Sequence, residues 1–387
     1  MSRGFVECLR VAAALAVTAI AAGRASTALA LTPSPSTGAF PPATVSKLDA
    51  AIANWFAAFK APGVVVAITI PGKGSYIVAR GKGDPATGKA MSLDDHVRIG
   101  SVTKTFTVTL LLQLADKKRL SLDDPVSKYE PFVPNGKNIT LRMLANMTSG
   151  LFSYTFDKQF VHDLFSDPHR PWTPRQLVDI SIKHKPPFLP GKGWQYCNTN
   201  TVLLGMILEK VTKHAIGDDF KTMSFAPLGL TNTFWPTGGN MPSPYAHGFS
   251  IQPLNKEKVD ASLWNPSWGF TAGQIVSNAQ DLRTWVKAYT TGAQLSAAIQ
   301  KQRLTWVTLP PNVPDHKYGL GIGFDHGWLG HTGELPGYNT AAFYLPAQDA
   351  TMVIEVNSDI PGPNDKDPAP ALFRALTTIV TPNNIGG

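Results

Sequence analysis

The sequence predicts a mixed α and β fold in which both ends of the chain build one sheet and a helical lobe is inserted between them. Three observations carry this prediction. Short β-branched runs occupy residues 63–71 and 75–80, further runs lie within residues 318–356, and the pattern between them is helical. The 387 residues are 43% hydrophobic and include 33 Gly and 32 Pro, which excludes a disordered tail and favours a loop-rich fold over a helical bundle.

The first part of the folded chain is expected to contain a helix and a hairpin. Residues 44–59 carry apolar side chains at helical spacing, with Thr44 as the expected cap. The runs at 63–71 and 75–80 are separated by Pro71-Gly72-Lys73-Gly74, a sequence typical of a hairpin turn. The sheet is therefore expected to begin early in the chain.

The middle of the chain is expected to be helical, and its end to return to strands. Helices are predicted at residues 101–117, 139–146, 174–182 and 199–212. Strands are predicted at residues 318–324, 328–333, 338–344 and 352–356, followed by a helix at 368–380. Because clefts form where such lobes meet, we expect the functional site between the sheet and the helical lobe.

The first thirty residues have the pattern of a secretory signal peptide. Twelve nearly unbroken apolar residues, 11–22, follow the basic Arg3 and Arg10 and precede the small-residue sequence Ala28-Leu29-Ala30. A helix that spans a bilayer needs about 20 apolar residues, so no stable membrane span is expected. We therefore expect a bacterial protein that is exported to the periplasm or cell envelope, or secreted.

After the signal peptide, the chain is expected to form one domain. Residues 31–42 are rich in Pro and Ser and predict a flexible lead-in. Residues 43–387 are expected to form the domain, with the helical lobe at about 115–270. Cys197 is the one thiol that remains after residue 30, so an internal disulfide is excluded and stability must come from the core.

The net charge of +8 does not indicate a nucleic-acid partner. The basic residues are scattered, and the densest groups are Lys117-Lys118-Arg119 and Lys183-His184-Lys185. Both groups are shorter than the basic runs of five to eight residues that typify nucleic-acid segments. A solvated surface therefore accounts for the charge.

A Ser-x-x-Lys sequence, Ser101-Val102-Thr103-Lys104, opens the predicted helix at 101–117. Residues three apart lie on one face of a helix, so Lys104 can reach the Ser101 hydroxyl. A serine hydroxyl needs a base to become a good nucleophile, and burial would lower the pKa of Lys104 toward that role. The helix N-terminus also favours the oxyanion that forms when Ser101 attacks a carbonyl. The alternative is Ser101 as a helix cap and Lys104 as a solvated side chain.

Two further motifs follow along the chain. In Tyr196-Cys197-Asn198, the phenol of Tyr196 can shuttle a proton and the amide of Asn198 can hold both the lysine and a substrate amide. The sequence His331-Thr332-Gly333 lies in a predicted strand, whose edge can pair with an extended substrate, and Gly333 permits close approach. The alternatives are turn-forming roles for Tyr196 and Asn198 and a structural histidine at 331.

These three motifs, in this order, resemble those of the penicillin-recognising serine hydrolases, namely D-alanyl-D-alanine carboxypeptidases, class C β-lactamases and related esterases. The resemblance covers roughly residues 43–358 and includes the stretches 120–129, 146–151 and 272–282. It implies an antiparallel sheet flanked by terminal helices, an all-helical lobe, and a site between them.

The resemblance also implies a role for each motif residue. Ser101 would be the acylated nucleophile, Lys104 its base, Tyr196 the proton shuttle and Asn198 the orienting amide. The backbone N–H groups of Ser101 and Glu334 would form the oxyanion hole. Residues His331, Thr332, Gly333 and Glu334 would contact the substrate, which would be a peptidoglycan peptide, a β-lactam or a small ester. No cofactor is implied.

Two departures from the carboxypeptidase pattern bear on the substrate. Glu334 follows the third motif, where its charge would repel a substrate carboxylate unless the side chain points away, and residues 319–327 supply no Arg. Both features favour an esterase or amidase that acts on a neutral group. Against this, the related esterases often have a degenerate third motif, which is intact here. The resemblance therefore implies an exported serine hydrolase of the cell envelope that is similar to a D-alanyl-D-alanine carboxypeptidase or a β-lactamase, with a carboxylesterase of the same family as the alternative. A non-catalytic penicillin- or cell-wall-binding protein is a second alternative, which the intact Ser101, Lys104 and Tyr196 disfavour.

Three other signals do not predict function. Residues 83–89 match a phosphate-binding loop until Ala90 replaces the required Ser or Thr, so a hairpin turn is expected there. His326 and His331 flank a Gly-rich turn with no nearby Cys or third His, so no metal site is expected. The chain also has no Gly-x-Ser-x-Gly sequence, which disfavours an α/β-hydrolase.

Overall fold

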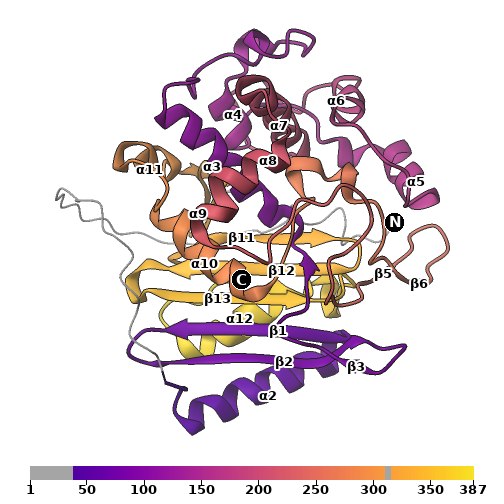
Figure 1. Cartoon of the computed structure of the whole chain (residues 1–387), viewed down its shortest axis with the longest axis vertical. Helices are drawn as coiled ribbons and strands as arrows, with labels where there is room; N and C mark the ends of the chain where they lie inside the picture. The colour runs from indigo at the N-terminus through magenta and orange to yellow at the C-terminus, as the bar shows by residue number, and fades with distance from the viewer. Residues whose placement is uncertain (1–37, 310–314) are drawn as a thin grey trace.

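One antiparallel sheet assembled from both chain ends dominates the computed structural model, which describes residues 38–309 and 315–387 (Figure 1). Its strands are β1 Gly63–Ile70, β2 Gly74–Asp84, β3 Lys89–Ala90, β8 Val307–Thr308, β9 His316–Tyr318, β10 Gly323–Asp325, β11 Trp328–Leu335, β12 Tyr338–Leu345 and β13 Ala350–Val356. In the described residues their order is β3-β2-β1-β13-β12-β11-β10-β9-β8. Strand β1 pairs with β13, with Val64 opposite Val356, and this pairing joins the two chain ends. The predicted sheet is confirmed.

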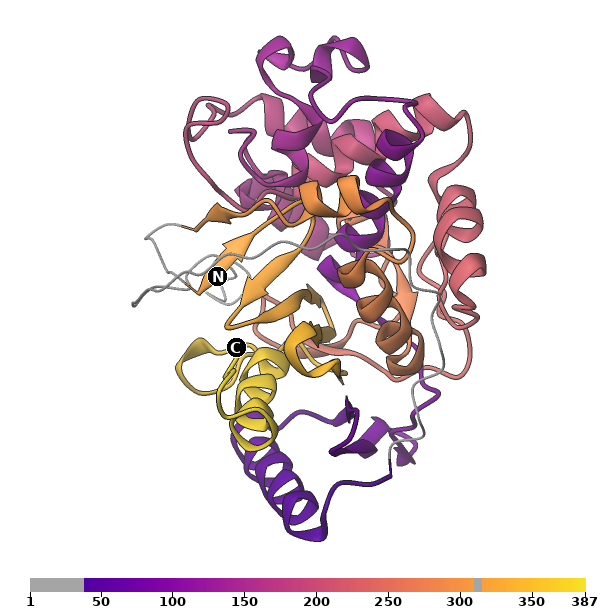
Figure 2. The same ribbon diagram turned by 90° about the vertical axis from the view of Figure 1, so that its left-hand side faces the viewer.

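Two terminal helices cover one face of this sheet. Helices α2 (Pro42–Phe59) and α12 (Pro368–Val380) pack side by side, as Figure 2 shows at the lower left. The Trp55 indole N–H donates to the Pro368 carbonyl at 2.8 Å and links the two helices. Alternate residues of β1 contribute to this layer because side chains along a strand alternate between its faces; they are Val64, Val66, Ile68 and Ile70.

The other face carries α10 (Ala279–Thr291) and the inserted lobe (Figure 1). The remaining helices are α3 Thr103–Asp116, α4 Leu141–Ala145, α5 Lys158–Ser166, α6 Pro174–Ile182, α7 Asn198–Thr212, α8 Ile216–Phe220, α9 Ala226–Leu228 and α11 Ala297–Arg303. Two short ladders pair β4 (Val97–Arg98) with β7 (Val276–Ser277) and β5 (Phe249–Ile251) with β6 (Lys258–Asp260). The insert expected at 115–270 thus contains the β5–β6 hairpin as well as helices.

Two predicted elements differ from the structure. Helix α2 begins at Pro42, so Thr44 lies within its first turn rather than capping it; Pro suits this position because the first N–H groups of a helix lack partners. The predicted strand 318–324 is two strands, β9 and β10, joined by a reversal. Gly321 makes the reversal with a φ of 63° and donates its N–H to the Ala145 carbonyl at 3.0 Å.

The folded domain begins before residue 43. The Phe40 side chain is buried, and Ser75 on β2 donates its N–H to the Gly38 carbonyl at 2.9 Å. Residues 38–42, the end of the predicted flexible lead-in, therefore belong to the domain. The expected signal peptide at 1–30 and the rest of the lead-in lie outside the described residues. Among the described helices, none has the length and apolarity needed to cross a bilayer.

Candidate active site

The Ser-x-x-Lys motif lies at the start of α3, beneath the inserted lobe. Ser101 sits in a single 3-10 turn, Gly100–Val102, which leads directly into the helix. Lys104 is fully buried, and its Nζ lies 2.8 Å from the Ser101 Oγ. The i, i+3 spacing places both side chains on one face, so the amine and the hydroxyl meet.

Backbone groups of residues 272–275 form hydrogen bonds with the N-terminal end of α3 and with the residues just before it. The Lys104 Nζ donates to the Ala272 carbonyl at 2.8 Å. The Ile275 N–H donates to the Thr103 Oγ1 at 3.1 Å, and the Ile275 carbonyl accepts from the Ile99 N–H at 3.0 Å. The amine is therefore fixed between a carbonyl and the Ser101 hydroxyl. The role of Ala272 was missed from the sequence because a carbonyl acceptor leaves no side-chain signal.

The Tyr-x-Asn motif approaches the same amine from the start of α7. The Lys104 Nζ lies 4.8 Å from the centre of the Tyr196 ring. Asn198 is the first residue of α7; its N–H donates to the Ser153 Oγ and its Nδ2 to the Thr155 Oγ1, both at 3.1 Å. These two contacts fix the amide. With Nδ2 engaged, the Oδ1 atom is the acceptor that Asn198 can offer to a ligand.

Strand β11 passes against the turn that contains Ser101, and two glycines permit the approach. A Cβ on Gly333 would lie 1.9 Å from the Ile99 carbonyl oxygen and 3.2 Å from the Ser101 nitrogen. Gly100 has a φ of 51°, and a Cβ there would lie 2.4 Å from the Glu334 nitrogen. The close approach of the two segments therefore places the backbone nitrogens of Ser101 and Glu334 near each other. Two such N–H groups can stabilise an oxyanion.

One edge of β11 is open beside this turn. Strand β12 pairs with β11 from Leu329 to Leu335. On the other side, β10 pairs only with Trp328 to Gly330. Among the described residues, no strand continues this ladder beyond Gly330. The main chain of residues 331–335 can therefore accept an extended ligand by strand addition.

The faces of β11 separate the residues of the third motif. Glu334 is opposite Asn339, whose side chain accepts from the Ala369 N–H on α12. Directly opposed residues share a face, so the Glu334 side chain leaves the strand on the face that α12 covers. Thr332, two residues earlier, lies on the same face. His331 and Gly333 lie on the opposite face of the strand, which is turned toward Ser101. The Glu334 side chain therefore leaves the strand on the face away from Ser101, while its backbone nitrogen lies beside the turn that contains Ser101.

His331 is a neutral ring with defined contacts. Its Nδ1 lies 2.5 Å from the Thr332 carbonyl, which can only accept, so Nδ1 carries the proton. Its Nε2 then accepts from the Tyr318 hydroxyl at 3.0 Å. Burial is the main cause that lowers the pKa of His331 to about 4. This ring therefore positions the strand and Tyr318 and does not titrate near neutral pH.

The expectation of no third histidine near His326 was wrong. His316 lies beside it across the β9–β10 pair, and Asp325 lies between the two rings. His331 points to Tyr318 instead. The predicted turn at residues 83–89 is present, since β2 and β3 form a hairpin there.

Comparison with known proteins agrees with this architecture. The family model described as Beta-lactamase matches residues 52–377. A D-stereospecific amidohydrolase from Streptomyces sp. has 32% sequence identity, covers 88% of this chain and 98% of its own, and superposes with a TM-score of 0.77. The D-amino acid amidase from Ochrobactrum anthropi SV3, at 24% identity, shares the fold with a TM-score of 0.76 over 87% of this chain and 97% of its own.

Two curated relatives are similar in sequence over part of their length. The Putative penicillin-binding protein PbpX of Bacillus subtilis is 28% identical over 67% of this chain and 61% of the relative. Protein flp of Staphylococcus aureus is 26% identical over 74% of this chain and 60% of the relative. The chain thus spans about three fifths of the length of these relatives. With a family model that matches most of its length, and with the fold described above, the chain belongs to the beta-lactamase family of serine acyl-enzyme hydrolases.

Proposed function

We propose that this protein is a serine amidase that forms an acyl-enzyme on Ser101 and acts on small amides or esters of D-amino acids. The contact of 2.8 Å between the Lys104 Nζ and the Ser101 Oγ is the observation that carries the proposal. The open edge of β11 beside Ser101 supports a substrate with an extended backbone. The 32% identity to the D-stereospecific amidohydrolase supports the amide bond and the D configuration.

The geometry suggests one sequence of proton transfers. Neutral Lys104 takes the Ser101 proton as Oγ attacks the substrate carbonyl, and the N–H groups of Ser101 and Glu334 stabilise the oxyanion. The Tyr196 hydroxyl gives a proton to the leaving amine and regains one from Lys104. Water then attacks the ester on Ser101 and loses a proton to Lys104 or Tyr196; this proton passes to Ser101 Oγ as the ester C–O bond breaks and the acid is released. Asn198 Oδ1 accepts from a substrate N–H.

A free carboxylate is not favoured by the groups around this site. Residues 319–327 supply no Arg. Arg98, which precedes the nucleophile motif, is buried and donates through Nη2 to the carbonyls of Gly239, Ser262 and Trp264. The strand-edge groups of β11 are uncharged backbone atoms. We therefore propose that amides and esters are turned over faster than D-alanyl-D-alanine peptides with a free carboxyl end.

A substrate panel tests this proposal. The purified protein is assayed with D- and L-alanine p-nitroanilide, p-nitrophenyl acetate, a diacyl D-alanyl-D-alanine peptide and a chromogenic cephalosporin. The proposal expects the highest kcat/KM for the D-anilide, with loss of at least a thousandfold in Ser101→Ala. Faster release of D-alanine from the peptide would make the protein a carboxypeptidase, and faster cephalosporin hydrolysis a β-lactamase. Hydrolysis of the acetate alone would make it an esterase, and no turnover at all would favour the non-catalytic protein.

We further propose that the protein is exported and loses its first thirty residues. The proposal rests on the apolar run 11–22 and on the Ala28-Leu29-Ala30 sequence. Expression of the full chain in a bacterium, followed by N-terminal sequencing of the extracytoplasmic protein, tests it. A mature chain that starts near residue 31 is expected, and recovery of the uncut chain in the cytoplasm would contradict the proposal.

A further inference from the structure

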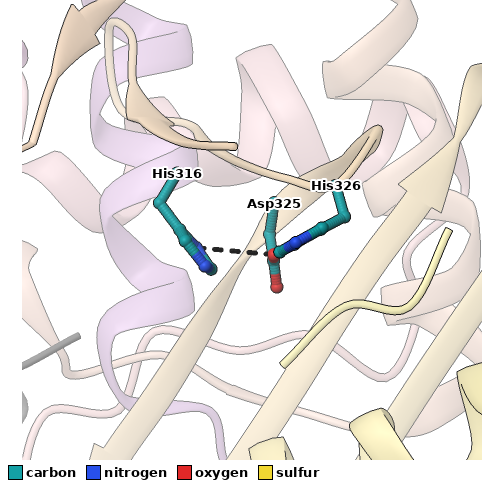
Figure 3. Close-up of side chains that lie close together, drawn as sticks. All are labelled: His316, Asp325 and His326. Carbon is teal, nitrogen blue, oxygen red and sulfur yellow. Dashed lines mark hydrogen bonds and ion pairs between the residues drawn. The ribbon is translucent and has the colours of Figure 1, made fainter. Parts of the chain in front are cut away.

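We propose that His316, Asp325 and His326 form a binding site for a divalent transition-metal ion, with Zn²⁺ as the best match. The three side chains converge at the open end of the β9–β10 pair, where the chain turns from β10 into β11 (Figure 3). Their ligand atoms lie within 4.8 Å of one another. Nothing in the catalytic proposal uses these residues, so the site is separate from Ser101.

The strand register brings two of the ligands together. His316 on β9 lies directly opposite Asp325 on β10, and the His316 Nδ1 is 3.4 Å from the Asp325 Oδ1. Opposed residues of an antiparallel pair share a face, so both side chains point the same way. Figure 3 shows the His316 ring directed at the carboxylate.

A left-handed backbone turn supplies the third ligand. Regular strand alternation would send His326 to the face opposite its neighbour Asp325. Instead His326 has a φ of 48°, and its Nδ1 lies 2.5 Å from the same Asp325 Oδ1. A non-glycine residue in this region is uncommon and costs backbone strain, and such strain accumulates at functional positions. The turn thus directs a second imidazole to the same oxygen.

The donor set suits Zn²⁺ more than Mg²⁺ or Ca²⁺. Two imidazole nitrogens and one carboxylate are borderline ligands that Zn²⁺ binds at about 2.0–2.2 Å, whereas Mg²⁺ and Ca²⁺ prefer oxygen alone. Tetrahedral Zn²⁺ with such bonds holds its ligand atoms roughly 3.3 Å apart. The two N–O distances between the rings and the Asp325 Oδ1, 3.4 and 2.5 Å, lie on either side of this spacing. Water would complete the four ligands.

The surroundings hold the carboxylate and the turn in place. The second oxygen of Asp325, Oδ2, accepts from the Gly387 N–H at 2.5 Å. Asn384 Nδ2 donates to the His326 carbonyl at 2.9 Å, and the His326 N–H donates to the Asp315 carbonyl at 3.1 Å. Partners of this kind orient metal ligands. Because β9 also carries Tyr318, which donates to His331, a metal here would clamp the strand that supports the third motif.

Calorimetric titration of the full chain with Zn²⁺ tests the proposal. An untagged protein is treated with EDTA, exchanged into buffer at pH 7.5 and titrated. We expect one saturable Zn²⁺ per chain, a rise in Tm of roughly 4 °C at a hundredfold excess over Kd, and at least tenfold weaker binding in His316→Ala. His162→Ala is the matched control, because His162 is exposed beside Asp163 and has no second imidazole; it should bind like wild type.

Two more variants protect the test against misfolding. His326→Asn keeps a residue that tolerates the left-handed backbone, and Asp325→Asn keeps the shape of the carboxylate. Each should retain the wild-type circular dichroism and bind Zn²⁺ at least tenfold more weakly. Co²⁺ should give the intense visible bands of a four-coordinate ion in wild type and in His162→Ala, but not in the three ligand variants. Absence of saturable Zn²⁺ binding in wild type, or unchanged binding in folded His316→Ala and His326→Asn, would overturn the proposal.

Discussion

The buried His331 ring should make folding stability depend on pH in a way that its replacement removes. In the folded protein its pKa is lowered from 6.5 to about 4, chiefly by burial. Between these values the unfolded chain binds a proton that the folded chain does not, so stability falls as pH falls. The contribution is fully present above pH 6.5 and is lost as pH falls through 4. From these two pKa values, the free energy of unfolding is expected to fall by about 2.5 kcal/mol between pH 7.5 and pH 4.5.

His331→Gln is the perturbation that isolates this contribution. Glutamine keeps a polar group beside Tyr318 but does not titrate. The carboxyl groups of Asp359 and Glu355 have pKa values raised by burial, to about 7 in Asp359, and act in the opposite direction. They are present in both proteins, so their effects cancel when the two free energies of unfolding are subtracted.

Urea unfolding followed by tryptophan fluorescence measures the difference. The free energy of unfolding is determined for both proteins at pH 7.5, 6.0 and 4.5, with equal m-values as the condition for comparison. Wild type should be the more stable protein at pH 7.5, and its advantage should shrink by about 2.5 kcal/mol at pH 4.5. If the difference in free energy of unfolding between wild type and His331→Gln stays constant with pH, His331 is not a buried, neutral ring.

Three further predictions concern the same region. Gly333→Ala should lower kcat/KM at least tenfold and reduce Tm, because its Cβ would lie 1.9 Å from the Ile99 carbonyl oxygen, whereas Gly238→Ala, with open space around its Cβ, should behave like wild type in the same assays. Glu334→Gln should change the ratio of kcat/KM for ester and free-carboxylate substrates by less than twofold, since its side chain starts from the α12 face; a tenfold change would place that charge at the substrate. Cys197 is buried with its pKa raised to about 11, so iodoacetamide at pH 8 should label it only in denaturant, and peptide mapping that finds native labelling would contradict this burial.

Much of the fold was predictable because its main strands and terminal helices have simple periodicity. Strand β1 is a continuous β-branched run, and the predicted helices at 174–182 and 368–380 match α6 and α12 in full. The prediction of a single strand at 318–324 was wrong. The chain reverses at Gly321, and this reversal is held by a hydrogen bond to the distant Ala145 carbonyl. Such long-range contacts leave no local signal.

One contact of the candidate site, between Lys104 and Ser101, was predictable from the sequence, whereas the expected hold of Asn198 on the lysine is replaced by its bonds to Ser153 and Thr155. Helical spacing alone placed Lys104 beside Ser101, and the structure has them in contact. The faces of β11 were not predictable, because the side of Glu334 depends on its register with Asn339. The association of His316 with His326 was also missed, since the unrecognised hairpin brings them together.

The central claim is that Ser101 becomes covalently acylated, and intact mass measurement tests it most directly. Wild type and Ser101→Ala are mixed with an activated ester of a D-amino acid, quenched in acid within milliseconds to seconds, and weighed; benzylpenicillin is used in a parallel sample. The account predicts an increase by one acyl group in wild type, located on the peptide that contains Ser101, and no increase in Ser101→Ala. An equal adduct on both proteins, or full turnover by Ser101→Ala, would contradict it.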